Sequence, residues 1–394
     1  MLLLGIVLHG AQAYLGSSHV IREPDRWYFY DVESSRFMAF VCGAIHVYRM
    51  PVFFVLAGFF AGLLISKRGL RGLIYNRFSR VVIPFAVALL TIVPAIFAAQ
   101  FLVDKIASTR PDVASSSTFP LAGLGGLHHL WFLWHLILFY ALTVFAIVCA
   151  RTIVRPQTGI HRVSLQLASL GDRIFNSGWG TILFCCISLF FLAPMKTTPG
   201  SIDSSFGVLP HSKVLGIYAL CYAYGLLLFR NRGRLEQLNR GAQYRIGFAI
   251  AALGTYLGLL GWALANQHVD RFQWALIGLG SLALWTMVEG WLALFQVYFS
   301  APNRLLRYLS DASYWIYLVH VPVMLLAQGA LANISAPALV KFSLAILLTA
   351  WVCVTSYHFL VRNTFMGELL NGRRYPVNLR WRRQKSIAAS KAES

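Results

Sequence analysis

The feature that most constrains this chain is a series of ten long apolar segments separated by short loops. A helix needs about 20 apolar residues to cross the roughly 30 Å hydrocarbon core of a bilayer. Only helices and closed barrels satisfy every backbone polar group in lipid, and runs of this length are typical of helices. We therefore predict an all-α, polytopic bundle of about ten transmembrane helices, over residues 1–16, 47–66, 81–103, 130–150, 178–194, 212–229, 246–265, 273–299, 313–332 and 338–361.

The composition excludes a soluble globular protein. Hydrophobic residues make up 58% of the 394 residues and charged residues only 12%, about half the charged fraction of an ordinary soluble domain. The same balance excludes intrinsic disorder and a small disulfide-stapled scaffold. A net charge of +20 does not indicate nucleic-acid binding here, because the basic residues lie in short loops between apolar runs.

The distribution of Lys and Arg over the loops predicts the orientation, because cytoplasmic loops retain positive charge. With both termini in the cytoplasm, the cytoplasmic loops and tail hold 24 of these residues and the opposite loops hold eight. This bias supports ten spans with both termini in the cytoplasm. We predict a transmembrane domain over residues 1–362 and a basic cytoplasmic tail over residues 363–394.

The six cysteines lie inside or at the edge of apolar runs, without CxxC spacing and without paired histidines beside them. We interpret them as small buried apolar side chains, and we expect no metal site and no tightly bound cofactor.

Ionisable groups at membrane depth are costly unless paired or hydrated, so each one is a functional candidate. Histidines outnumber carboxylates here, which is unusual for an ion-coupled carrier and suits proton abstraction from a hydroxyl. A purely structural role is the alternative for these residues: a histidine can hydrogen-bond a neighbouring helix, Lys341 can snorkel to the interface, and Glu289 can pair with Arg49. The candidates are His9, His46, Arg49, His128, His129, His135, Glu289, His320, Lys341 and His358.

Arg77 and Arg80 lie at the predicted cytoplasmic end of the third span. Residues three apart share one face of a helix, so the two guanidinium groups can grip one phosphate. Ordinary positive-inside anchoring is the alternative that the spacing leaves open.

Four segments together resemble signature elements of the acyltransferase-3 family of integral-membrane acyltransferases. The Arg77-x-x-Arg80 step resembles its RxxR motif, although Ala57 stands where the second-span element normally has serine. Ten spans is also the number in that family. The other elements are the second-span segment 51–59, the HLWFL segment 129–133 and the SxxIYLxH segment 312–320.

Within the family, segments 2–9, 45–54 and 316–322 are similar to the glucan biosynthesis protein C branch, the succinyltransferases of periplasmic glucans. The resemblance implies transfer of an acyl group, with succinyl favoured, from a cytoplasmic acyl-CoA to a carbohydrate hydroxyl on the far side of the membrane. It implies acyl-CoA, in this branch succinyl-CoA, and a glucan as partners.

The resemblance and the chemistry of acyl transfer suggest roles for the candidate residues. A hydroxyl that attacks a thioester needs a general base, for which His9 is the candidate. A developing oxyanion needs donors, which Arg49, His46 or His320 can supply. Arg77 and Arg80 would bind the CoA phosphates, and His129, Trp131 and Glu289 would line the substrate path.

One departure from the family pattern lies in the first span. His9 matches the family's histidine, but the basic residue that precedes it by eleven positions would fall upstream of Met1. The first span is also short and uncharged. We expect that the chain begins upstream of Met1.

Two functions of other classes fit part of the pattern. A secondary transporter fits the ten spans, although no pair of related halves with matched broken helices is evident. A lipid-linked glycosyltransferase can use acidic residues of its first outer loop, which here has four carboxylates interleaved with arginines. We expect those carboxylates to pair within the loop; they are Glu23, Asp25, Asp31 and Glu33.

Overall fold

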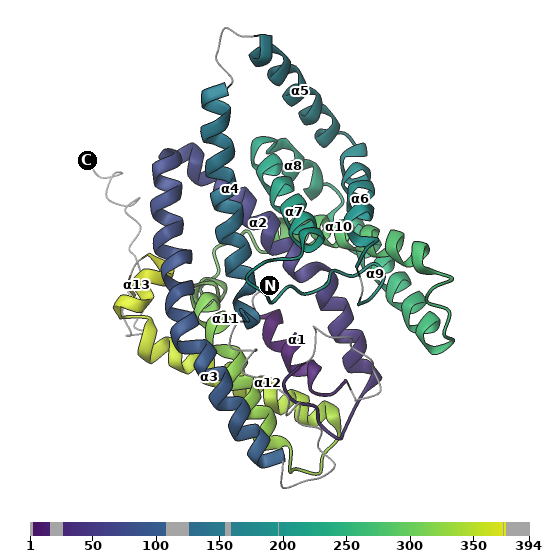
Figure 1. Cartoon of the computed structure of the whole chain (residues 1–394), viewed down its shortest axis with the longest axis vertical. Helices are drawn as coiled ribbons and strands as arrows, with labels where there is room; N and C mark the ends of the chain where they lie inside the picture. Colours follow the sequence, from purple (N-terminus) through teal and green to yellow (C-terminus); the bar gives the residue numbers. More distant parts are fainter. Residues whose placement is uncertain are drawn as a thin grey trace, which may run out of the picture.

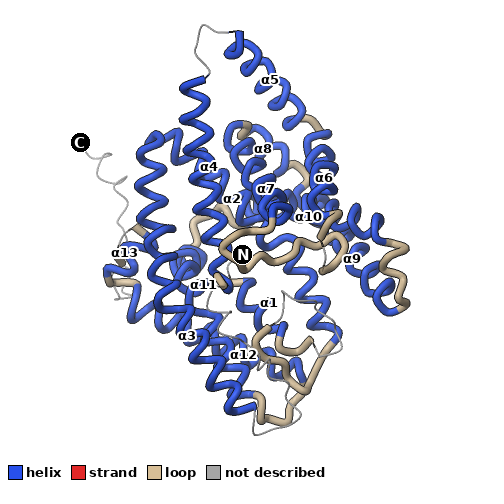
Figure 2. Tube along the Cα trace, in the orientation of Figure 1, coloured by secondary structure: helices blue, strands red, loops and turns tan. Residues whose placement is uncertain are grey.

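The computed structural model describes residues 3–15, 27–107, 126–153, 159–195, 197–372 and 374–375. Helices account for most of these residues, and none of them belongs to a β-strand (Figure 2). The apolar helices are long enough to cross a bilayer several times. The prediction of an all-α, polytopic membrane protein is therefore confirmed.

The described helices follow one another along the chain as Figure 1 labels them. Three short π or 3-10 turns, at Phe78–Val82, His128–Leu130 and Tyr357–Val361, extend longer helices. The α-helices are α1 (Leu4–Gln12), α2 (Arg36–Arg77), α3 (Ile83–Ala107), α4 (Trp131–Ile153), α5 (Gly159–Asn176), α6 (Trp179–Leu192), α7 (Ser212–Arg230), α8 (Gly233–Asn239), α9 (Ala242–Ala265), α10 (Gln273–Tyr298), α11 (Arg304–Leu331), α12 (Ala338–Ser356) and α13 (Phe365–Asn371).

Each of the ten predicted spans coincides with a helix, although not every helix has the length of a span. The described residues hold seven helical stretches long and apolar enough to cross a membrane, or up to eight if the bent pair α5 and α6 forms one span. Helix α1 has nine residues and α6 has 14. The number of ten spans and the cytoplasmic side of both termini therefore stay predictions.

Helices α2 and α3 belong to one helical stretch of 71 residues, Arg36–Ile106. At 1.5 Å per residue, a straight stretch would measure roughly 105 Å, more than three hydrocarbon cores. Gly69 interrupts it with a positive φ of 65°, a conformation that glycine adopts without steric cost. Figure 1 shows the chain turning over in this region, so that α2 and α3 run as separate rods.

Helix α1 packs against α2, α11 and α12 and carries His9 into the bundle (Figure 1). Its small residues allow this close packing. A Cβ atom at Gly10 would lie 3.1 Å from Ile346 of α12 and 3.4 Å from Met324 of α11. Helix association in membranes depends on such small residues, because lipid offers no hydrophobic driving force between helices.

Helices α2 and α7 touch through their backbones. A Cβ atom at Gly58 would overlap the carbonyl oxygen of Tyr222, and one at Gly225 would overlap the carbonyl oxygen of Val55. The glycine of the second-span element therefore has a packing role, since no other residue permits this approach.

Lys341 forms a buried ion pair with Asp31, contrary to the interpretation that it snorkels. Its Nζ lies 2.9 Å from Oδ1 and 3.0 Å from Oδ2, and the lysine side chain is only 3% exposed. The backbone N–H of Asp31 donates to the carbonyl oxygen of Ala13, which holds the carboxylate against the end of α1. Asp31 therefore pairs with α12 and not within its own loop; Glu23 and Asp25 lie outside the described residues.

Candidate active site

The imidazole of His9 is held on two sides near the centre of the bundle. Its Nδ1 donates to Oε1 of Gln12 over 2.6 Å. Its ring is stacked on the indole of Trp27, with centroids 4.9 Å apart and planes at 19°. Because Nδ1 is engaged by an amide oxygen, Nε2 is the nitrogen that remains for a substrate.

The ring of His320 lies beside that of His9, with centroids 5.2 Å apart. Its Nδ1 donates to the carbonyl oxygen of Tyr317 over 2.7 Å. A carbonyl oxygen only accepts hydrogen bonds, so the proton of a neutral His320 must be on Nδ1. Nε2 of His320 is buried without a hydrogen-bond partner.

His129 completes the group, with its ring centroid 5.5 Å from that of His320. Its Nε2 donates to the carbonyl oxygen of Leu318 over 3.1 Å, and its Nδ1 is buried without a partner. In an uninterrupted α-helix that carbonyl would accept from the N–H of residue 322. Residue 322 is proline, which has no N–H. Pro322 thus leaves the Leu318 oxygen available to orient His129.

The three imidazoles therefore share one arrangement, although they come from α1, α11 and the turn before α4. Each donates its N–H to a carbonyl or amide oxygen and keeps one bare nitrogen. Buried polar atoms without partners are uncommon, and in a cleft they indicate a place for a ligand. This arrangement can accept protons from a bound hydroxyl.

Arg49 of α2 brings a positive charge to the same group. A Cβ atom at Gly5 would lie 3.2 Å from Nη1 of Arg49 and 3.4 Å from Nε2 of His320, so both atoms line the space beside Gly5. Nε of Arg49 is buried without a partner, and no ion pair among the described residues includes Arg49. The guanidinium is available to an anion.

His46 lies three residues before Arg49 on α2, and its ring bonds elsewhere. Its Nε2 donates to the carbonyl oxygen of Ile202 over 2.8 Å, which ties the loop after α6 to α2. This bond occupies one of the two ring nitrogens.

A cavity of about 260 Å³ has both predicted phosphate-binding arginines, Arg77 and Arg80, in its lining. Cζ of Arg77 lies 4.7 Å from the ring centroid of Tyr140, which also lines the cavity. Tyr317 also lines it and donates to the carbonyl oxygen of His129 over 2.7 Å. The cavity wall is therefore continuous with the residues that hold His129 and His320.

Comparison with known proteins shows the family of the chain. The model of the acyltransferase domain of the acyltransferase-3 family matches residues 2–358. The chain belongs to the acyltransferase-3 family. It is 26% identical to glucans biosynthesis protein C of Escherichia coli K12 over 347 residues, covering 82% of this chain and 80% of the relative. It is 24% identical to the protein of that name in Salmonella heidelberg over 388 residues, covering 95% and 92%. No solved structure matches.

The resemblance elements of this acyltransferase-3 chain meet in space. The segments around His129 and His320 supply two of the three imidazoles, and the Arg77-x-x-Arg80 step lines the cavity. The glycine of the second-span element packs α2 against α7.

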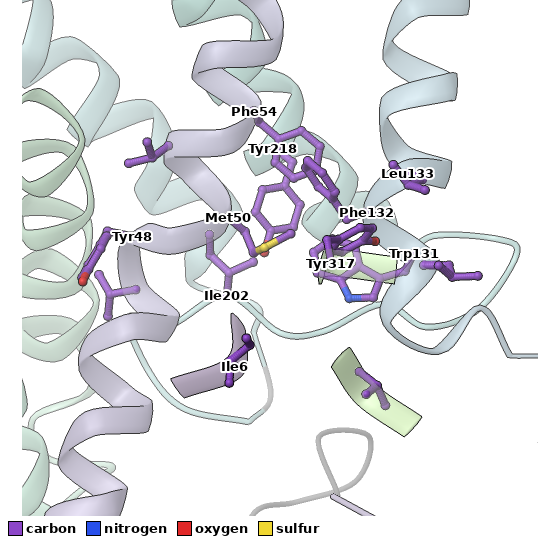
Figure 3. Packing of buried hydrophobic residues seen from close by; sticks show 14 of the residues in the cluster. Ile6, Tyr48, Met50, Phe54, Trp131, Phe132, Leu133, Ile202, Tyr218 and Tyr317 are labelled. Atoms are coloured by element: carbon purple, nitrogen blue, oxygen red, sulfur yellow. The ribbon is translucent and has the colours of Figure 1, made fainter. Parts of the chain in front are cut away.

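Trp131 lies in the buried aromatic group next to the cavity (Figure 3). Its ring centroid is 5.5 Å from that of Tyr218 and 5.1 Å from that of His135. Figure 3 shows it close to Phe132 and Tyr317, which both line the cavity. In this position Trp131 supports the cavity wall from behind.

Glu289 is bound by other partners than Arg49, contrary to the interpretation of a Glu289–Arg49 pair. Its Oε1 accepts from the hydroxyl groups of Thr181 and Tyr224 and from Nη2 of Arg234. Arg245 lies 3.7 Å from Oε2. The carboxylate joins α6, α7, α8 and α9 to α10, and its role in the substrate path stays an untested prediction.

The sequence analysis missed three residues that hold His9. Trp27 donates from Nε1 to Oε1 of Gln328 over 2.7 Å, and Nε2 of Gln328 donates to the carbonyl oxygen of His9 over 3.1 Å. Gln12 accepts from Nδ1 of His9. Gln328 is fully buried in an apolar span. A neutral polar residue in such a span indicates a hydrogen bond to a neighbouring helix, but a search limited to ionisable groups does not find it.

Proposed function

We propose that this protein moves an acyl group, with succinyl favoured, from cytoplasmic acyl-CoA to a hydroxyl of a periplasmic glucan or another cell-envelope carbohydrate in the bacterial inner membrane. Membership of the acyltransferase-3 family establishes an acyltransferase. The names of the relatives support a glucan acceptor. The observation that carries the mechanism is the meeting of His9, His320 and unpaired Arg49 at one space.

The proposed reaction has one bond formed and one broken. The acceptor hydroxyl oxygen attacks the thioester carbonyl carbon while Nε2 of His9 removes its proton. The negative charge that develops on the carbonyl oxygen is stabilised by the guanidinium of Arg49. The new C–O bond remains, the C–S bond breaks, and the proton passes from His9 to the sulfur of CoA.

His9 is favoured over His320 as the base for a physical reason. Nε2 of His320 is buried among its neighbours, whereas His9 is only partly buried, which leaves room for an acceptor. Gln12 fixes the tautomer that exposes Nε2 of His9. His320 and His129 supply the polar wall against which the two substrates are aligned.

The donor would enter through the cavity of Arg77 and Arg80. Two guanidinium groups in its lining suit the phosphates of CoA, because phosphate is bound best by several charge-assisted hydrogen bonds. The rest of the lining is largely apolar and includes Phe53, Phe132 and Leu133, which suits the pantetheine arm and the thioester.

The test is acyl transfer by the purified protein in lipid nanodiscs, with isotope-labelled succinyl-CoA and periplasmic glucan. We expect His9→Ala to lower the transfer rate at least about 100-fold, the usual effect of losing a general base. His268→Ala is the matched control, because His268 is an exposed histidine on the loop after α9. Equal rates for the wild-type protein and His9→Ala, with both folded, would remove His9 from this role.

A further inference from the structure

Arg49 presents an unusual electrostatic situation in the resting protein. The described residues have two buried carboxylates, and neither pairs with Arg49. Asp31 pairs with Lys341, and Glu289 pairs with Arg234. The three imidazoles beside Arg49 donate to neutral oxygens and add no negative charge. A cation in such surroundings is costly unless an anion joins it.

An oxyanion exists only during the reaction, so it does not offset the cost of the unpaired Arg49 charge in the ground state. A substrate with a permanent negative charge offsets that cost as soon as it binds. The proposed function assigns the CoA phosphates to Arg77 and Arg80, which line the cavity, whereas Arg49 does not. The remaining part of the donor that can carry charge is the acyl group itself. A carboxylate at the far end of a dicarboxylic acyl group would pair with Arg49 as soon as the donor binds.

The spacing of two α1 residues is comparable to the length of a short acyl group. Gly5, next to Nη1 of Arg49, lies one helical turn before His9 on α1, a rise of about 6 Å. In a succinyl group two methylene carbons separate the carbonyl carbons, a span of roughly 4 Å at 1.5 Å per bond. The terminal carboxylate would form an ion pair of about 2.8 Å with Arg49.

Gly5 is required for this position of Arg49. A side chain on Gly5 would press on Nη1 of Arg49 and on Nε2 of His320. A guanidinium has five N–H donors, and no described residue accepts from them, so one edge can bind a carboxylate while another faces the reacting carbonyl.

We infer that Arg49, with Gly5 leaving the space, is the residue that selects an acyl donor with its own terminal carboxylate. This inference rests on the proposed function. Arg49 recognises the carboxylate of a succinyl-type group, and a neutral acyl group of equal length leaves the guanidinium unpaired.

The experiment compares the binding of succinyl-CoA and butyryl-CoA, which have the same four-carbon chain with and without the carboxylate. Dissociation constants are measured by calorimetry in nanodiscs on the His9→Ala protein, so that transfer does not consume the donor. We expect succinyl-CoA to bind about 100-fold more tightly, a factor in the range of a buried charge-assisted pair. Adding Arg49→Gln brings this ratio close to one.

Two further variants keep the test decisive if Arg49→Gln is poorly folded. Arg49→Lys keeps the charge and retains a preference of about tenfold, while Gly5→Ala displaces Nη1 and lowers the preference with the charge intact. Arg271→Gln, which removes an exposed arginine from the loop between α9 and α10, leaves the ratio unchanged.

The outcomes separate the inference from the proposed function. A ratio close to one with Arg49 present, or an unchanged ratio in Arg49→Gln, overturns the role of Arg49 in selectivity. If the folded protein binds neither thioester nor free CoA, the proposed function fails and the inference fails with it.

Discussion

Nδ1 of His9 and Oε1 of Gln12 lie 2.6 Å apart, one helical turn from each other on α1. In many histidine bases a carboxylate accepts the hydrogen bond from Nδ1. Here the amide of Gln12 accepts it instead, and it orients the imidazole without adding charge. A neutral partner suits a site that already contains a cation, since a carboxylate here would pair with Arg49 and compete with an anionic donor.

The first prediction concerns this bond. Gln12→Leu removes the acceptor, so the ring of His9 samples both tautomers and other orientations. We expect kcat to fall about tenfold while KM for acyl-CoA changes less than twofold, because the bond acts on the base and not on the donor. A rise in KM equal to the fall in kcat would contradict this role.

The second prediction concerns Pro322, which frees the Leu318 carbonyl for His129. Pro322→Ala supplies an N–H that competes for this oxygen and repairs the helix. We expect the melting temperature to rise, since proline inside a helix costs up to about 3 kcal/mol. We expect transfer to fall about tenfold because His129 loses its orientation. The two measurements are made on the same preparation, and lower stability together with lower activity would show a purely structural proline.

The positions of the helices were predictable because apolar length is a local property. The segments 246–265 and 273–299 agree closely with α9, Ala242–Ala265, and α10, Gln273–Tyr298. The length of the first helix was harder to predict from the sequence. Helix α1 has only nine residues, and it is held by packing against α2, α11 and α12. The separate spans 47–66 and 81–103 predicted a turn in the chain between them, but not that the backbone would stay helical on both sides of Gly69.

The candidate site residues could be singled out from the sequence, but their hydrogen-bond and ion-pair partners could not. His9, Arg49, His129 and His320 were singled out because polarity at membrane depth is costly, and they meet in space. The predicted pair of Glu289 with Arg49 and the predicted snorkelling of Lys341 were both wrong, because pairing depends on which helices become neighbours. Gln12 and Gln328 were missed, since neutral amides do not appear in an inventory of charged groups.

The third prediction concerns the ion pair between Asp31 and Lys341, both of which are buried. Asp31→Asn leaves an unpaired ammonium inside the protein and should lower the free energy of unfolding by about 3–5 kcal/mol. The double replacement Asp31→Leu with Lys341→Met removes both charges and should recover most of that loss. Unfolding in mild detergent, followed by tryptophan fluorescence, measures both variants. A double variant that is less stable than Asp31→Asn would show that the pair is required for more than charge compensation.

The fourth prediction concerns the two arginines that line the cavity. Under the proposed function, Arg77→Gln and Arg80→Gln each remove a charge that binds the donor, so we expect KM for acyl-CoA to rise about tenfold with kcat changed less than threefold. The effect should shrink in high salt, because screening weakens the wild-type attraction. Arg71→Gln is the matched control, since Arg71 is an exposed arginine on the same helix and does not line the cavity. If Arg71→Gln raises KM as much as Arg77→Gln, the two cavity arginines act only through the general positive charge of that part of the surface, as expected for topology anchors.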